Sequence, residues 1–70
     1  MVLAHQFNSE GHVVRLAVEE TSTGWDVREE LDTRLVHIQH FDDWHRVERS
    51  MKLLELDVIR HGYAAIATHH

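Results

Sequence analysis

The spacing of apolar residues changes once along the chain, close to Asp42 and Asp43. Before this point apolar side chains recur at every second residue, which is the repeat of a half-buried strand. After it they recur every three or four residues, which is the repeat of an amphipathic helix. A chain of 70 residues has room for one small domain, so both parts are expected to share one hydrophobic core.

The part before the change predicts an antiparallel meander of three or four strands. Residues 12–20 and 25–31 alternate between apolar and polar side chains. The link between them, residues 21–24, holds short polar residues and a glycine, which is typical of a hairpin turn. One face of these strands is expected to meet solvent, and it carries Arg15, Glu19, Asp26, Arg28 and Glu30.

Two further strands are marked less clearly. Residues 35–41 follow a weak turn at 32–34, but neither of their faces is clearly polar, so their register stays open. Residues 3–7 are a candidate first strand, and its existence also stays open. Residues 8–11 suit a type I turn with glycine in the last position.

The part after the change predicts a helix over about residues 43–61. Asp42 or Asp43 suits the N-cap, because a short side-chain oxygen accepts hydrogen bonds from the free amides of the first turn. Gly62 suits the position just after the helix, and Tyr63 would then pack back on Val58. The apolar stripe expected to cover the sheet consists of Trp44, Val47, Met51, Leu54 and Val58.

The sequence therefore predicts a single α+β domain over residues 1–70. Its antiparallel three- or four-stranded β-meander is followed by one C-terminal α-helix, which packs on one face of the sheet. The tail over residues 63–70 has no evident anchor, and we expect it to be mobile or to reach toward a partner. His69 and His70 are either native residues or part of a purification tag.

The composition limits the classes of protein to which the chain can belong. It contains no cysteine, which excludes disulfides and thiolate metal sites and fits a reducing cytoplasm. No apolar run is long enough to cross a bilayer, and the N-terminal residues lack the features of a signal peptide. We therefore expect a soluble, cytoplasmic protein without a membrane partner and without a cofactor.

Eight histidines raise metal binding as one alternative function. His37 and His40, with His45 nearby, form the most suggestive group, but residues three apart on a strand point to opposite faces. Asp57 and His61 lie one helical turn apart and could share an ion. Neither pair has an evident third ligand, which a tetrahedral zinc site requires, so we predict no metal site.

No combination of nucleophile, acid and base in the sequence predicts catalysis. Ser50, Asp57 and His61 share one side of the predicted helix, but Ser50 would lie about 10 Å from Asp57 along the axis, beyond hydrogen-bond reach. Four carboxylates are expected to cluster beside the hairpin at 21–24, where they would mainly repel one another and hydrate. These four carboxylates are those of Glu19, Glu20, Glu29 and Glu30. We therefore expect no enzyme activity.

Nucleic-acid binding is the second alternative function. A three-stranded sheet followed by a helix is similar in plan to the plant ethylene-response DNA-binding domain, which reads DNA with its sheet. Residues 12–41, however, hold three basic and six acidic residues, and the net charge of −5 also disfavours binding to phosphates. The helix offers the better candidates, which are Arg46, Arg49, Lys52 and Arg60.

Leu53 and Leu56 fall outside the apolar stripe of the helix and are predicted to face away from the sheet. Arg49 and Arg60 fall between them on the helical wheel, and Ile59 widens the apolar surface on one flank. Leucines beside arginines are typical of a protein interface, and closed two-fold dimers are the commonest assemblies. The leading hypothesis is a small non-enzymatic protein–protein interaction module that forms a homodimer or holds another protein.

Two alternatives to this helix interface stay open. Isolated leucines on a surface are common and need no partner. A dimer could also form through an unpaired sheet edge, at the first or the last strand of the meander. The sequence does not choose between the helix face and the sheet edge.

Overall fold

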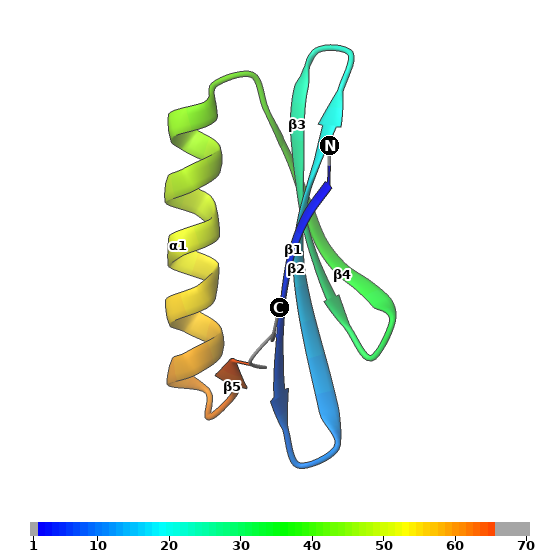
Figure 1. Cartoon of the computed structure of the whole chain (residues 1–70), viewed down its shortest axis with the longest axis vertical. Helices are drawn as coiled ribbons and strands as arrows, with labels where there is room; N and C mark the ends of the chain where they lie inside the picture. Colours follow the sequence, from blue (N-terminus) through cyan, green and yellow to red (C-terminus); the bar gives the residue numbers. More distant parts are fainter. Residues whose placement is uncertain (1, 66–70) are drawn as a thin grey trace, which may run out of the picture.

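The structure, a computed structural model, describes residues 2–65 and confirms the predicted α+β architecture. One helix, α1 (Trp44–Arg60), packs across one face of a five-stranded antiparallel sheet (Figure 1). The strands follow one another in the sheet in the order β4-β3-β2-β1-β5. Their bounds are β1 Val2–Ser9, β2 His12–Thr21, β3 Gly24–Leu31, β4 Arg34–Phe41 and β5 Ala64–Ala65.

The core lies between α1 and the central strands of the sheet. Val18 pairs with Leu3 of β1 and with Val27 of β3, so these side chains share the face that α1 covers. Leu16 and Val27 are fully buried there. The predicted stripe of α1 supplies the other half of the core, with Val47, Met51 and Val58 buried and Trp44 and Leu54 packed against them.

Both ends of α1 are fixed by the residues that the sequence indicates. Asp43 is the N-cap, and its side chain accepts a hydrogen bond from the His45 N–H at 2.9 Å. At the other end Gly62 has φ 91°, and the Tyr63 N–H donates to the Val58 carbonyl at 3.2 Å. This is a Schellman motif, and it turns Tyr63 back against the core as predicted.

Two hairpin turns share one conformation, and one of them differs from the turn type expected from the sequence. Glu10 and Gly11 have φ of 48° and 86°, and Asp32 and Thr33 have φ of 50° and 71°. Positive φ at both central residues belongs to a two-residue type I′ loop, so the type I turn expected at residues 8–11 is wrong. The reason is the twist of the strands, which type I′ matches, so β1 continues through Ser9.

Gly24 allows the chain to pass close to the start of β3. A Cβ atom at this position would lie 2.1 Å from the Phe41 carbonyl oxygen and 2.9 Å from Asp42 Cα. Trp25 follows, pairs with Phe41 across the sheet, and meets Trp44 edge to face with ring centroids 5.3 Å apart. The beginning of α1 is therefore held level with the end of β4.

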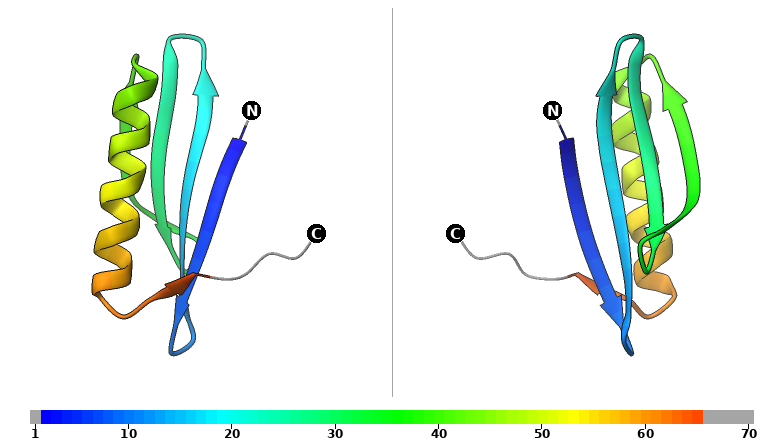
Figure 2. Two further views of the ribbon diagram at one scale, coloured as in Figure 1. Left: turned by 60° about the vertical axis from the view of Figure 1, so that its left-hand side comes forward. Right: turned by 90° about the vertical axis from the view of Figure 1, so that its right-hand side faces the viewer.

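The chain after α1 provides a fifth strand that the sequence does not indicate. Ala64 and Ala65 pair with Asn8 and Phe7 of β1, which anchors the start of the tail beside the core (Figure 2). Residues 66–70, including His69 and His70, lie outside the described residues. The sheet thus has a short covering strand on one edge and β4 on the other.

The glutamate cluster expected beside the hairpin at 21–24 does not form. Glu29 pairs with Leu16, and Glu30 pairs with Arg15, near the middle of β2. Only Glu19 and Glu20 lie close to the hairpin. The antiparallel register explains the difference, because residues 29 and 30 are already far along β3 from the turn.

Candidate interaction surface

The outer edge of β4 is open along the whole strand. Within residues 2–65, β4 pairs only with β3, and no strand or helix lies beside its other edge (Figure 2). Leu35, Val36 and Ile38 are each about half exposed, at 49%, 54% and 48%. An unpaired strand with exposed aliphatic side chains is a template for pairing with another strand.

A β-bulge in β4 distributes these aliphatic side chains over both faces of the sheet. The register shifts between Glu29 and Glu30, which pair with His37 and Leu35, so Val36 is the extra residue. Val36 lies beside Val58 and Tyr63 on the helix side. Ile38 pairs with Arg28 on the opposite side. Each face of β4 therefore carries both apolar and polar side chains.

A groove of about 510 Å³ runs between α1 and β4 on the helix side of the sheet. The strand contributes His37, Gln39 and Phe41 to its lining. The helix contributes two apolar residues, Leu53 and Leu54, and four polar ones, which are Arg46, Arg49, Ser50 and Asp57. The exposed edge of β4 and the outer flank of α1 therefore form one continuous surface.

The five interface residues predicted from the sequence do not all belong to this surface. Leu53, 61% exposed, and Arg49 line the groove beside β4. Leu56 and Ile59 are exposed, at 51% and 52%, but they do not line the groove, and neither does Arg60. Leu53 is thus the predicted leucine of the helix face that also lies beside β4, the strand with the open edge.

The four basic candidates for nucleic-acid binding are divided between two flanks of α1. Arg46 and Arg49 line the groove beside β4, whereas Lys52 lies near Leu3 and Glu55 on the β1 side. Arg60 is at the end of the helix, outside both groups. Within residues 2–65 these four side chains therefore form no continuous stripe along which a phosphate backbone could run.

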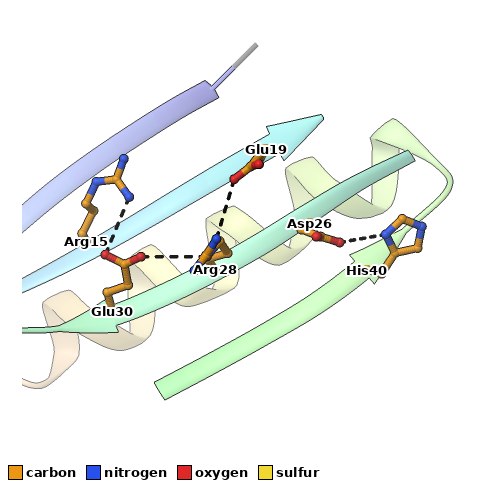
Figure 3. Close-up of polar contacts among 6 residues, drawn as sticks. All are labelled: Arg15, Glu19, Asp26, Arg28, Glu30 and His40. Atoms are coloured by element: carbon orange, nitrogen blue, oxygen red, sulfur yellow. Dashed lines mark hydrogen bonds and ion pairs between the residues drawn. The ribbon is translucent and has the colours of Figure 1, made fainter. Parts of the chain in front are cut away.

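The sheet face opposite α1 carries charges that pair with one another (Figure 3). Arg15 lies 3.7 Å from Glu30, and Arg28 lies 3.8 Å from Glu30 and 3.7 Å from Glu19. Beneath this network Ala17 is only 2% exposed, although the sequence places it on the solvent face. The basic groups of this face are therefore engaged by carboxylates and are poorly placed to bind phosphates.

The histidines that suggest a metal site occupy separate places. His37 lines the groove, whereas His40 is on the opposite face with its Nδ1 2.8 Å from Asp26, as the strand geometry predicts. His61 Nδ1 lies 2.7 Å from the Asp57 carbonyl oxygen. Among the described residues no three histidine or carboxylate side chains come together as metal ligands.

A histidine–carboxylate pair closes the β3–β4 turn against β2. His12 Nδ1 lies 2.6 Å from one carboxylate oxygen of Asp32, and the Val13 N–H donates to the other at 2.8 Å. The hydrogen bond to Asp32 and the charge of Asp32 raise the pKa of His12 above its ordinary 6.5. The hydrogen bonds from His12 and Val13 lower the pKa of Asp32 below its ordinary 3.8.

Comparison with known proteins adds no further assignment. The chain matches no protein-family model, no curated protein and no solved structure. Among residues 2–65, no helix has both the length and the apolar character needed to cross a membrane. The residues of β4 and of the flank of α1 are therefore the only indication of what this surface binds.

Sequence reasoning missed Leu35, Val36 and Ile38 as surface residues with a candidate function. The available signal was the absence of a polar face in residues 35–41 of the last strand of the meander. A strand that is apolar on both faces and also lies at an edge exposes apolar groups wherever the helix does not reach.

Proposed function

We propose that the protein is a small interaction module that functions as a homodimer in the cytoplasm, with a binding role and no catalytic one. The proposed interface is the outer edge of β4 with Leu53 of α1. One observation carries this proposal: the open edge of β4 has half-exposed aliphatic side chains at three of its eight residues. The absence of cysteine supports the reducing compartment.

The energetics favour a dimer of moderate affinity. Full burial of a large aliphatic side chain yields about 1.5–3 kcal/mol, so a half-exposed one can add roughly 1 kcal/mol on association. Leu35, Val36, Ile38 and Leu53 from two copies give roughly 8 kcal/mol, which is comparable with the cost of association. Backbone hydrogen bonds between two β4 edges supply the surplus, and we expect a dissociation constant in the micromolar range.

The test is the solution mass measured by light scattering after size-exclusion chromatography, over a range of micromolar concentrations. Wild type is expected at twice the chain mass. Ile38→Lys is expected at the chain mass, because lysines on an edge strand oppose edge pairing and the two copies would bring like charges together. Leu56→Lys is the matched control, since Leu56 is equally exposed but lies on α1 and not on the β4 edge. A dimer that withstands Ile38→Lys but not Leu56→Lys would reject the β4 edge in favour of the outer helix face.

A further inference from the structure

We infer that two copies pair their β4 strands antiparallel about a two-fold axis near Ile38, and that Arg46 of each copy then meets Asp57 of the other. This inference rests on the proposed function and adds the register of the dimer and the residues that make self-recognition specific. Both helices would lie on the same face of one continuous sheet. The leucines at position 53 would lie between the two charged pairs.

The structure fixes how α1 lies relative to β4. At one end Phe41 pairs with Trp25, whose ring packs on Trp44, so the end of β4 is level with the start of α1. At the other end Val36 lines the same hollow as Asp57 and Val58. The helix therefore runs alongside β4 in the opposite direction.

Simple rises per residue then locate the middle of this arrangement. From Phe41 back to Ile38 is about 10 Å along a strand, and from Trp44 to Met51 is about 10 Å along a helix. Ile38 is therefore level with Met51. A two-fold axis at this level brings together helix positions that are equally far on either side of Met51, and Arg46 and Asp57 satisfy this condition to within one residue.

The direction of the side chains is consistent with the same axis. Opposed residues of antiparallel strands point to the same face, so pairing Ile38 with its own copy keeps both helices on one side. Ile38 faces away from α1, opposite Arg28, and two copies would bury it against itself. The regular part of β4 after the bulge at Val36 is residues 37–41, and its centre at Gln39 is one residue from Ile38.

Two opposite charges in the groove can pair with each other only between copies, and one of them, Asp57, also lies 3.7 Å from His61 Nδ1 of its own chain. Arg46 and Asp57 both line it, but they are about 16 Å apart along one helix and cannot pair within the chain. In residues 2–65 no carboxylate lies within 4.0 Å of Arg46. The two-fold axis would place each arginine opposite a carboxylate, giving two ion pairs per dimer.

Charge reversal in separate copies tests this register. Arg46→Glu alone and Asp57→Arg alone each put like charges together twice, and each is expected to weaken the homodimer at least about tenfold. An equimolar mixture restores opposite charges at both contacts, so native mass spectrometry should show a heterodimer in preference to either homodimer. The double variant Arg46→Glu/Asp57→Arg in one chain should form a homodimer again. Circular dichroism of each variant checks that the fold is retained.

The outcomes separate the register from the proposed function. If both single variants dimerise like wild type and the mixture shows no preference, while Ile38→Lys is monomeric, the β4 edge stands and the inferred register is wrong. If wild type itself is monomeric at about 100 micromolar, both are rejected. Preferential heterodimers together with a restored double variant would establish the antiparallel two-fold arrangement.

Discussion

The two edges of the sheet are completed in different ways. On one edge β5 pairs with Phe7 and Asn8 of β1, and Phe7 beneath it is only 3% exposed. On the other edge β4 has no such neighbour within residues 2–65, and Ile38 remains 48% exposed. The part of β1 that β5 covers therefore serves the core, and Leu3 farther along β1 is 45% exposed. The β4 edge has three half-exposed apolar side chains that the core does not use.

Truncation of one side chain at each edge should have the largest effect and tests whether the two edges have different roles. Phe7→Ala is expected to cost about 3–5 kcal/mol of unfolding free energy, because it opens a cavity in a small core. Ile38→Ala is expected to cost about 1 kcal/mol or less in the monomer and to weaken association instead. Urea unfolding at low concentration, paired with light scattering at high concentration, measures both effects.

A milder variant at the same position can be measured if Phe7→Ala does not fold. Phe7→Leu is expected to cost about 1.5 kcal/mol or less while leaving the dimer intact at concentrations where the fold is populated. Equal loss of stability from Ile38→Ala and Phe7→Ala in the monomer would contradict the division of roles between the two edges.

Two glycines, one near each edge, test the same difference through the backbone. Gly24→Ala is expected to cost about 3 kcal/mol, because its Cβ would collide with backbone atoms of Phe41 and Asp42 that hold the end of β4. Gly11→Ala, in the β1–β2 turn, meets no atom within 4 Å and is expected to cost about 1 kcal/mol from its positive φ alone. Thermal unfolding of the two variants checks the order, and a larger loss at Gly11 would contradict it.

The smallest expected effect is the pH dependence of the His12–Asp32 pair, which ties the β4 turn to β2. The raised pKa of His12 means that its contribution is complete below about pH 6.5 and is lost as the pH rises through the raised value. The lowered pKa of Asp32 means that its contribution is complete above about pH 3.8 and is lost as the pH falls through the lowered value. The pair therefore stabilises most between these two pH values.

The variant His12→Asn isolates this contribution. The difference in melting temperature between wild type and His12→Asn is expected to be larger at pH 5.5 than at pH 8.5, because the charged histidine is lost at the higher pH. An NMR titration of His12 should give a pKa above the ordinary 6.5 of a histidine. An equal difference in melting temperature at both pH values would contradict the proposed pair.

Much of this fold could be predicted because local chemistry and the hydrophobic pattern agree. The stripe of α1, its cap at Asp43 and the return of Tyr63 onto Val58 all depend on residues within one or two turns of each other. The alternation of Val14, Leu16 and Val18 likewise sets the buried face of β2. Each of these features is encoded by neighbours in the sequence.

The features that could not be predicted depend on contacts between distant parts of the chain. Ala64 and Ala65 have no strand pattern of their own and pair only because α1 returns the chain to β1. Ala17 is buried by charged neighbours from an adjacent strand. The bulge at Val36 changes which side chains share a face with Ile38, and no residue in β4 signals it. The sequence therefore indicated Leu53 and an open edge at the first or last strand as separate alternatives, but not the side chains of β4 that join them.

Amide hydrogen exchange at two protein concentrations is the most direct test of whether two copies meet at the β4 edge, because it measures the protection of both sheet edges in one experiment. The account predicts that the outward-facing amides of β4 become more protected as the concentration rises through the micromolar range. Amides of residues 3–6 of β1, on the opposite edge, should show no comparable change. Exchange in β4 that is independent of concentration, or protection that rises on β1 instead, would contradict the β4 edge as the site where two copies meet.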